Sequence, residues 1–422
     1  MKVPKALTAT SRRANITWFV LGVVAVMLMA LYANYQIPRG NWFFTGHYAC
    51  QFCDITSRIG DVWNVRMGRV LYTFYPHKQY FTYPPAALFL FYPLTWFPKM
   101  VAIYVWTALS IFSYGGLLAI AWWWLRRTLT LRTIGIAFLC AVLGVTFLPT
   151  MSILLSQGQT ASMLAFMVAA DALLIKGRGR GVLTGVAAAL KIYPIFFIGF
   201  WLVRREWRPA ITALVSGATT TLLAWAIWPH HSYRFFFERL SSGKEISHFH
   251  DNIHWRSSSA SPYTFFYRPP FQGGALGSIL GMVAVAAIAI LGMFAAVRLY
   301  RRGYRLTSFV VALMGSTMAA PVVWDHYFAW ALLLPLVAYE VGWRRWMGLA
   351  ALVAFITLLV PWGLARDENF SYVGFDLITV LLFFARNALL FSTVAVMCLS
   401  WTLPVRSQLD REELAVVSGE RA

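Results

Sequence analysis

The chain has 422 residues, of which 59% are hydrophobic, 17% aromatic and only 12% charged, and its mean hydropathy is +0.62. Soluble domains carry about a quarter charged residues, so this composition excludes an ordinary soluble protein and indicates lipid as the main solvent. The formal charge is +20, but most basic residues lie in short loops between apolar runs. Membrane topology and lipid headgroups explain basic residues in such loops, and nucleic-acid binding is not expected.

Long apolar runs recur through the chain, and most approach the roughly 20 residues that cross a bilayer core. They are continuously apolar and do not alternate, which favours helices over a membrane barrel. No internal repeat or linker divides the chain. We therefore predict an all-α polytopic membrane protein, a single integral membrane domain over residues 1–422, with about 12 transmembrane helices. The expected spans are residues 15–36, 84–97, 101–125, 132–149, 158–175, 181–202, 208–228, 275–299, 304–323, 326–342, 346–364 and 376–402.

Two long polar stretches, residues 37–83 and 229–273, interrupt these spans. If the spans alternate from residue 208 onward, both stretches lie opposite the later basic clusters, which the positive-inside rule places in the cytosol. Residues 37–83 are then the first extracytoplasmic loop, and residues 229–273 are the large later one. The basic clusters that carry this assignment are Arg204-Arg205, Arg298 with Arg301-Arg302, Arg344-Arg345 and Arg406.

The earlier spans leave two topologies open. Twelve full crossings would place the basic residues 126–127 and 176–180 outside the cytosol, against the positive-inside rule. Broken or re-entrant segments at 84–97 and 181–202 would return these residues to the cytosol. The first of these segments is short, and Pro194 interrupts the second, which makes this alternative physically reasonable.

The first polar loop contains a predicted amphipathic helix over residues 54–70. Its apolar residues fall mostly on one side and arginines are interleaved, which is typical of a helix that lies on a membrane interface. The apolar set is Ile55, Ile59, Val62, Trp63, Val65 and Met67, and the basic set is Arg58, Arg66 and Arg69.

Acidic residues are rare, so each carboxylate in a polar loop is informative. Asp61 stands out because it follows Gly60 within the amphipathic helix, on a surface otherwise rich in arginine. Such a carboxylate, held at the lipid–water boundary, could accept a proton from a hydroxyl group. The alternative is a helix charge or an ion-pair partner for Arg58. The other outer-face candidates are Asp54, Glu238, Glu245, Asp251, Asp325, Asp367, Glu368 and Asp376.

Lys191 lies inside an apolar segment, in the string Lys191-Ile192-Tyr193-Pro194. An ionisable residue within a membrane segment suggests a functional site, and lysine commonly binds phosphate. The alternative is a side chain that snorkels to the interface. Asp171 also lies within an apolar run, where we expect a structural ion pair with Lys176 or Arg178.

Two further polar positions open apolar runs: Gln159, and His326 within Trp324-Asp325-His326-Tyr327. Both could contact a phosphate or sugar, or simply cap a helix or turn. The histidines of the 229–273 loop lack regular ligand spacing, so no metal is expected. There is no P-loop or dinucleotide fingerprint, and no cofactor is expected.

Several short strings are informative through their order and spacing: Gly60-Asp61-Val62-Trp63, Gly68-Arg69-Val70-Leu71-Tyr72, Tyr83-Pro84-Pro85-Ala86-Ala87, Gly158-Gln159, Gly181-Val182-Leu183-Thr184-Gly185, Lys191-Ile192-Tyr193-Pro194 and His326. Together, they resemble glycosyltransferase family 87 of the GT-C superfamily, the polyprenyl-phosphate-mannose-dependent α-mannosyltransferases of actinobacterial envelopes. One departure is Asn252-Ile253-His254-Trp255, where many relatives carry Asn-Gln-Ser, and it leaves the acceptor open.

The resemblance implies a GT-C fold and an inverting transfer at the outer, periplasmic face of the cytoplasmic membrane. The donor would be polyprenyl-phosphate-mannose, and the acceptor a glycolipid similar to a phosphatidylinositol mannoside, joined through an α-1,2 linkage. Asp61 would be the general base on the acceptor hydroxyl. The implied contacts to the donor phosphate or the acceptor are His326, Lys191, Arg66, Arg69, Arg256, Arg268, Gln159 and Tyr193.

Three alternatives stay open at this point. A related enzyme could move another lipid-linked sugar, such as arabinofuranose. A transporter or flippase for lipid-linked glycans is a second alternative, although transporters usually contain inverted repeats and polar residues near the membrane midplane. A purely structural assembly partner is the third.

Overall fold

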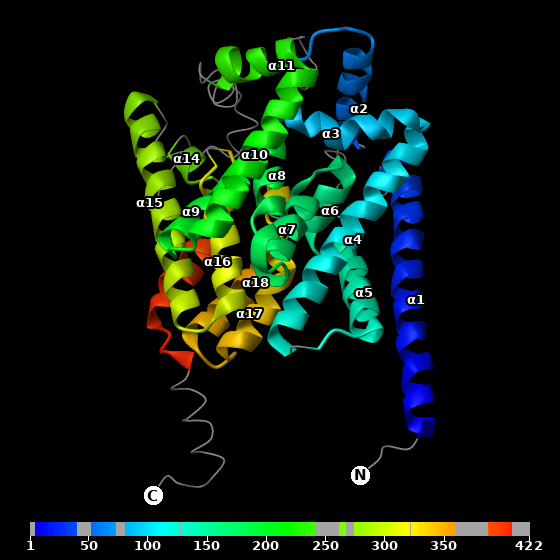
Figure 1. Cartoon of the computed structure of the whole chain (residues 1–422). Helices are drawn as coiled ribbons and strands as arrows, with labels where there is room; N and C mark the ends of the chain where they lie inside the picture. Colours follow the sequence, from blue (N-terminus) through cyan, green and yellow to red (C-terminus); the bar gives the residue numbers. More distant parts are fainter. Residues whose placement is uncertain are drawn as a thin grey trace, which may run out of the picture.

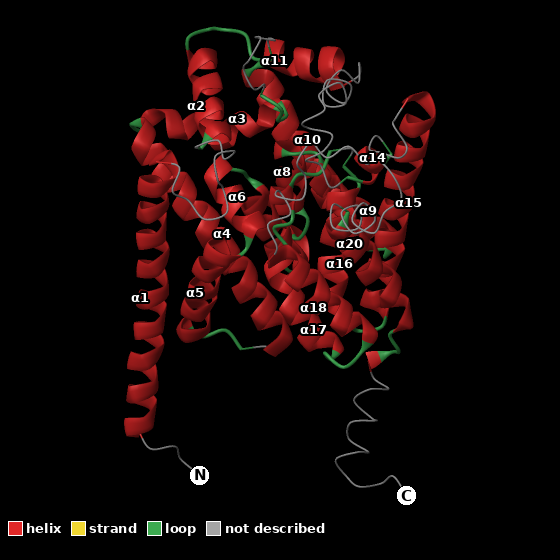
Figure 2. Ribbon diagram, turned by 180° about the vertical axis from the view of Figure 1, so that it is seen from behind, coloured by secondary structure: helices red, strands yellow, loops and turns green. Residues whose placement is uncertain are grey.

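A computed structural model describes residues 5–39, 52–72, 81–126, 128–240, 261–266, 274–320, 322–359 and 387–406, and these residues form helices, turns and loops without a β-strand. Long helices such as α1 (Lys5–Gln36) and α15 (Gly274–Arg301) run along one direction of the molecule, whereas the short α3 (Leu88–Phe91) and α11 (Pro229–Tyr233) lie across it at one end (Figures 1 and 2). The all-α prediction is therefore confirmed for the described residues.

Within the described ranges, four helices are long and apolar enough to cross a membrane. They are α1 Lys5–Gln36, α4 Lys99–Arg126, α10 Trp207–Ile227 and α15 Gly274–Arg301. A fifth span results if α5 Leu131–Phe147 and α6 Pro149–Gln157, bent by 89°, are counted together. These helices support a membrane protein, but the expected number of about 12 full spans is not confirmed, because the other apolar helices are shorter.

Proline accounts for several of these interruptions, since it lacks an N–H and disfavours helical geometry in the residue before it. The expected span 84–97 forms one short continuous helix, made of η3 Pro85–Ala87, α3 Leu88–Phe91 and η4 Tyr92–Trp96. The expected span 181–202 is divided into α8 Val182–Leu190, η7 Tyr193–Ile195 and α9 Phe196–Val203. Of the two segments that the topology argument left open, 181–202 is broken at the extended backbone of Lys191, whereas 84–97 is short but continuous.

The predicted amphipathic helix forms as α2 Cys53–Arg66, four residues shorter at its C-terminal end than expected. The remaining elements are η1 Ile37–Arg39, α7 Ala161–Ala169, η5 Ala170–Leu174, η6 Gly177–Gly179, α11 Pro229–Tyr233, η8 Arg234–Leu240, α14 Pro262–Phe265, α16 Arg305–Met318, η9 Asp325–Tyr327, η10 Ala331–Leu333, α17 Leu334–Val341, α18 Trp346–Leu359, α20 Ala388–Leu399 and η12 Ser400–Thr402.

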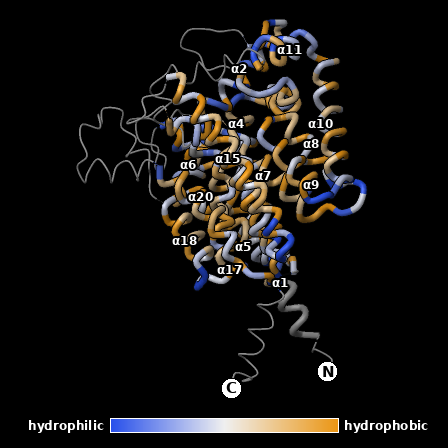
Figure 3. Tube along the Cα trace, turned by 90° about the vertical axis from the view of Figure 1, so that its left-hand side faces the viewer, coloured by the Kyte–Doolittle hydropathy of each residue, from blue (hydrophilic) through white to orange (hydrophobic). Residues whose placement is uncertain are grey.

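The two ends of the helix bundle differ. Elements α2, α3 and α11 lie at one end, and α17 and the start of α5 lie at the other (Figure 1). Hydrophobic residues dominate the middle of the bundle, whereas hydrophilic residues gather at helix ends, including α11 (Figure 3). This distribution matches a protein whose middle faces lipid and whose ends face water.

Small residues allow α1 and α5 to pack closely. A Cβ atom placed on Gly22 would lie 2.5 Å from the carbonyl oxygen of Gly135, and one on Gly135 would collide with the backbone of Trp18. Close approach through small residues is a common way for membrane helices to associate, because lipid supplies no hydrophobic driving force between them.

We expect Gly135→Leu to lower the free energy of unfolding by about 1–3 kcal/mol, because overpacking must push α1 and α5 apart. The measurement is thermal unfolding of the purified protein in detergent. Gly179→Ala is the control, since a Cβ there would make only an ordinary contact, at 3.6 Å, with the side chain of Ile175. Equal stability of the two variants would contradict the close α1–α5 contact.

Candidate active site

Polar side chains from several distant parts of the chain gather around the face of α2 that carries Asp54, Arg58 and Asp61. These three residues are spaced i, i+4 and i+7, which places them on one side of the helix. The helix begins after Phe52, whose backbone N–H donates to the carbonyl oxygen of Ser156 at 2.7 Å. This bond ties the start of α2 to the end of α6.

Arg58 is buried in this face of α2. Its side chain faces the rings of Phe81 and Tyr83, with 5.6 Å between the guanidinium carbon and each ring centroid. Its Nη1 also lies 3.4 Å from Oδ2 of Asp61, which is itself only 7% exposed. Asp61 is thus an ion-pair partner of Arg58, which is the alternative to a general base that the sequence left open. Arg58 itself is buried and does not lie on the surface.

The junction between α6 and α7 adds an amide to the cluster. The side chain of Gln159 donates to the Asp54 carboxylate through Nε2, while its Oε1 accepts a hydrogen bond of 3.0 Å from the Tyr83 hydroxyl. Thr160 Oγ1 donates to the same hydroxyl at 3.4 Å. Gln159 therefore bridges α2 and the segment that leads into η3.

Gly158 makes this junction possible. It has φ of 74°, which favours glycine, and its carbonyl accepts a hydrogen bond of 2.9 Å from Trp106 Nε1. A Cβ at this position would lie 2.5 Å from Cβ of Ile55 on α2. The close approach of α2 to the junction thus requires a residue without a side chain.

Lys191 lies where α8 ends, at the break before η7, and is surrounded by tyrosine rings. Its Nζ lies 5.0 Å from the ring centroid of Tyr83, 4.4 Å from that of Tyr327 and 6.0 Å from that of Tyr193. The rings of Tyr193 and Tyr327 stack at 5.9 Å. Aromatic faces attract an ammonium group, so the three rings hold the Lys191 amine in position. Lys191 and Asp54 are only half-buried, which leaves both within reach of a ligand.

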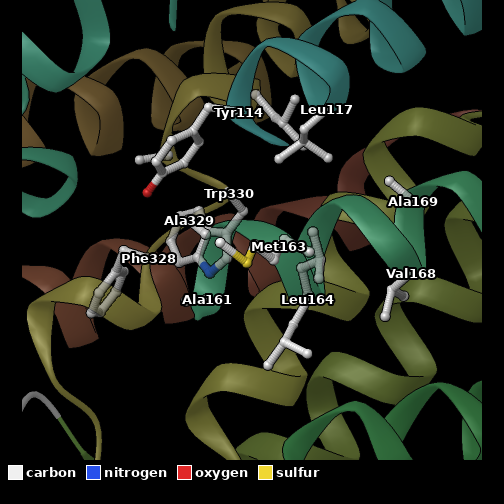
Figure 4. Packing of buried hydrophobic residues seen from close by; sticks show 14 of the residues in the cluster. Tyr114, Leu117, Ala161, Met163, Leu164, Val168, Ala169, Phe328, Ala329 and Trp330 are labelled. Atoms are coloured by element: carbon white, nitrogen blue, oxygen red, sulfur yellow. The ribbon is translucent and has the colours of Figure 1, made fainter. Parts of the chain in front are cut away.

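His326 on η9 is 5% exposed, and the positive charge of Lys191 lies within electrostatic reach of its ring. The residues that follow η9 anchor it in the core, where Phe328, Ala329 and Trp330 pack near α4 and α7 (Figure 4). Trp330 Nε1 also donates to Thr317 Oγ1 at 3.2 Å. The core thus determines where the polar residues of η9 lie.

The surroundings tune two groups at the site. Burial raises the pKa of Asp54, while the charges of Arg58 and Lys191 and the hydrogen bond from Gln159 act in the opposite direction. Burial also raises the pKa of Tyr83 to about 12, so its hydroxyl stays a neutral hydrogen-bond donor at neutral pH. A carboxylate with a raised pKa is a stronger base once it is ionised.

Besides Asp61 on α2, the structure brings together four predicted site residues: Lys191, Gln159, Tyr193 and His326. It does not bring Arg66 or Arg69 into the cluster. The side chains of these two arginines have other contacts at the end of α2. Arg66 Nη1 donates to the carbonyl and the hydroxyl of Thr95 at 3.1 and 3.0 Å, and the exposed Arg69 donates to Asn64 Oδ1 at 3.4 Å. Arg256 and Arg268 lie outside the described residues.

The sequence prediction of the site residues left out Arg58, Tyr83 and Tyr327 and gave Asp54 no particular role. The i, i+4 and i+7 spacing on α2 was an available signal for Asp54 and Arg58. No local pattern identifies Tyr83 or Tyr327 as neighbours of Lys191, because these residues meet only through the fold.

Asp171 has a structural role, as expected, but with different partners. Its Oδ1 accepts a hydrogen bond of 2.7 Å from the backbone N–H of Gly181, and its Oδ2 accepts one of 2.9 Å from that of Thr184. The carboxylate therefore caps the N-terminus of α8, where a negative charge is favourable. The expected ion pair with Lys176 or Arg178 is replaced by these backbone bonds.

No group of three or more histidine, cysteine or acidic side chains suited to a metal ion occurs within the described part of the chain. The candidate site consists of one half-buried carboxylate, a nearby ammonium group, a buried histidine, an amide and several tyrosines. This combination can accept a proton and bind an anion such as a phosphate.

Comparison with known proteins identifies the family to which the chain belongs. The pattern of glycosyltransferase family 87 matches residues 81–324, more than half of the chain, and the chain belongs to this family. The matched region contains Tyr83, Gln159 and Lys191.

Three curated relatives are similar to the chain. A "polyprenol-phosphate-mannose-dependent alpha-(1-2)-phosphatidylinositol mannoside mannosyltransferase" of Mycobacterium tuberculosis is 28% identical over 286 residues, 63% of each chain. A protein with the same name from Mycolicibacterium smegmatis is 27% identical over 287 residues, also 63% of each chain.

The third relative, from Mycolicibacterium smegmatis, is a "polyprenol-phosphate-mannose-dependent alpha-(1-2)-phosphatidylinositol pentamannoside mannosyltransferase". It is 23% identical over 352 residues, 80% of this chain and 78% of the relative. No solved structure gives a significant match.

The Arg58–Asp61 pair can be tested by a double-mutant cycle. We expect Arg58→Leu to lower the free energy of unfolding by about 3–5 kcal/mol, because it leaves the buried Asp61 carboxylate without its arginine. The double variant Arg58→Leu/Asp61→Leu should lose less than the sum of the two single variants. Thermal unfolding in detergent measures all three. The exposed Arg69→Leu is the control, with a change within about 0.5 kcal/mol, and strictly additive effects would contradict the buried pair.

Proposed function

We propose that this chain is an inverting glycosyltransferase that moves mannose from a polyprenyl-phosphate donor to a membrane glycolipid. The acceptor is a hydroxyl of a phosphatidylinositol-mannoside-like lipid, and the new bond is an α-1,2 linkage. Membership of family 87 and the activities named for three relatives support this proposal. The observation that carries it is the cluster in which Lys191 lies within electrostatic reach of both Asp54 and His326.

The chemistry needs only one base. The acceptor oxygen attacks C1 of mannose from the face opposite the phosphate, and its proton passes to a carboxylate. The bond between C1 and the phosphate oxygen breaks, and its electron pair stays on that oxygen. Because the attack is direct, a β-linked donor gives an α-linked product without a covalent enzyme intermediate, so a second carboxylate nucleophile is not required.

The departing lipid phosphate gains negative charge during this step, since a phosphodiester becomes a phosphomonoester. A cation next to it stabilises the developing charge. Lys191 provides that cation in the proposal, with His326, Tyr193 and Gln159 as further contacts to the phosphate or to the sugar. Arg66, Arg69, Arg256 and Arg268 stay proposed phosphate contacts, to be tested individually, although Arg66 and Arg69 lie outside the cluster.

Asp54 is the proposed general base. It contacts Gln159, is within electrostatic reach of Lys191 and is half-buried, so an acceptor hydroxyl can approach it. Asp61, the base expected from sequence, is more deeply buried and forms an ion pair with Arg58. In this proposal Asp61 holds Arg58 in position, and its role as the base is the competing hypothesis.

The proposed setting is a GT-C fold in the cytoplasmic membrane, with the site on the periplasmic side. Basic residues gather at the opposite end of the bundle, as the positive-inside rule requires of a cytosolic end. The end of α2 exposes Trp63 by 45% and Met67 by 71%, which suits a helix at a membrane interface. The proposal retains about 12 membrane-crossing or partly crossing segments, several of them broken.

Substitution of the two aspartates distinguishes the two candidate bases. We expect Asp54→Asn to lower the rate of mannose transfer by about 10²–10⁴-fold, the usual contribution of a general base. Asp61→Asn should retain most of the activity, provided that the variant folds. The measurement is transfer of radiolabelled mannose from polyprenyl-phosphate-mannose to a phosphatidylinositol-mannoside extract, with folding checked by thermal unfolding.

Each result of this experiment has a distinct meaning. Loss of activity only in Asp61→Asn would identify Asp61 as the base and contradict the assignment of Asp54. Transfer by the wild type from another lipid-linked sugar, but not from mannose, would contradict the proposed donor and keep the reaction class. No transfer from any lipid-linked sugar by folded wild type would contradict the transferase proposal itself.

The pH dependence of transfer reports the same carboxylate. Because the pKa of Asp54 is raised, activity should fall on acidification at a pH above the ordinary range of aspartate, as the base becomes protonated. The hydrogen bond from Gln159 lowers that pKa, so Gln159→Met should move the acidic limb of kcat/KM to higher pH. Gln157→Met, two residues earlier on α6, is the control and should leave the limb in place. A limb that does not move in Gln159→Met would contradict Asp54 as the titrating base.

A further inference from the structure

A second polar region lies at the other end of α8, away from the candidate active site. Lys191 follows the last residue of α8, whereas Arg180 and Gly181 immediately precede its first residue. The helix has 9 residues, which at 1.5 Å per residue separates its two ends by about 13 Å. The two regions are therefore distinct, and the second is not used by the proposed transfer reaction.

This second region contains a cavity of ≈ 220 Å³. Four basic side chains line it, from the loop before α8, the end of α9 and the start of α16: Lys176, Arg180, Arg204 and Arg305. Aromatic and apolar residues form the rest of its wall, among them Trp124, Phe200 and Phe309. The cavity thus combines a cationic lining with an apolar wall.

The positive charge of the cavity is only partly neutralised. Glu206 contacts two of the arginines: its carboxylate lies 2.8 Å from Arg180 Nη1 and also forms an ion pair with Arg204. One carboxylate against four cations leaves a net charge of +3 among these five residues. Basic residues elsewhere at this end are used differently, since Arg298 donates to the carbonyl oxygens of residues 400 and 401 at 3.0 and 2.6 Å.

Arg204 is the buried centre of this lining. Its side chain is only 4% exposed and stacks on Tyr300, with 3.2 Å between the guanidinium carbon and the ring centroid. The Nε atoms of Arg204 and Arg180 are buried and have no hydrogen-bond acceptor among the described residues. Arg204 thus holds a guanidinium group in the wall of the cavity, beside a single carboxylate that it shares with Arg180.

We propose that this cavity binds a phosphate group. Arginine matches the geometry of phosphate oxygens, and basic pockets between membrane helices on the cytoplasmic side commonly hold lipid headgroups. The volume is below the roughly 300–1,000 Å³ of pockets for drug-sized ligands, so it suits a headgroup whose acyl chains stay outside. A membrane lipid or a soluble phosphate can supply this chemistry.

The test measures binding of phosphatidylglycerol, diacylglycerol and inorganic phosphate to the purified full-length protein in detergent, without donor or acceptor. Native mass spectrometry follows the lipids, and the shift in thermal unfolding follows the phosphate. The test variant is Lys176→Gln/Arg305→Gln, because both side chains are exposed and their loss should leave the fold intact. Arg178→Gln is the matched control: it is equally exposed on the same loop but does not line the cavity.

We expect the test variant to bind phosphatidylglycerol about 10-fold more weakly than the control, which corresponds to about 1.4 kcal/mol. Diacylglycerol, which lacks the phosphate, should not distinguish the two variants. If only inorganic phosphate distinguishes them, the phosphate site stands and its ligand is soluble. If neither probe distinguishes them, the proposal is overturned. Because no transfer is measured, this outcome is independent of the proposed function.

Discussion

Backbone groups that a helix break leaves without an intrahelical partner must be hydrogen-bonded inside the protein when the break lies in an apolar segment. This constraint determines where the candidate site lies. The α6–α7 break places the carbonyl of Gly158 against Trp106 at 2.9 Å, and the α8–η7 break places the carbonyl of Tyr193 against the hydroxyl of Ser316 at 2.7 Å. The same breaks bring Gln159 and Lys191 out of their apolar helices and into contact with α2 and η9. The polar site is thus a consequence of how the broken helices satisfy their backbone.

The ionisable groups near the site divide into structural and chemically available ones by their exposure and partners. Arg58 and Asp61 are both buried and partnered, and together they stabilise the face of α2. Asp54 and Lys191 are partly buried, and each keeps some accessible surface. Ion pairs that are fully buried contribute to a unique arrangement more than to chemistry, whereas a base or a phosphate-binding cation has to be reached by its ligand. Exposure therefore favours Asp54 over Asp61, although both carboxylates lie on the same helix face.

Element α8 connects two regions with different charge. Asp171 caps its N-terminal end, close to the cationic cavity, and Lys191 follows its C-terminal end at the candidate site. The cavity has more basic than acidic groups, whereas the candidate site contains both signs in contact. This difference is consistent with a membrane protein whose one end meets anionic headgroups and whose other end performs acid–base chemistry.

Composition and local patterns alone predict the lipid environment, the helical class, the amphipathic helix and the family, because each depends on residues close together in the chain. Continuous apolar runs lack the period of a barrel strand, and the short strings around Gly60, Tyr83 and Lys191 keep their order and spacing. The same patterns marked Gln159, Lys191, Tyr193 and His326 as polar positions inside apolar surroundings. The patterns selected these four residues as candidates for the site, because a polar group in an apolar setting requires a partner or a function.

Only the tertiary structure decided which residues meet. Gln159 is 105 residues from Asp54 and 76 residues from Tyr83, and no period of a helix relates such positions. The extent of the helices also depended on the fold, because a broken segment is stable only where neighbouring elements supply hydrogen bonds for its free backbone groups. For the same reason, sequence favoured Asp61 as the prominent carboxylate, whereas its buried pairing with Arg58 and the partly buried position of Asp54 appear only when α2 is packed against α6 and η4.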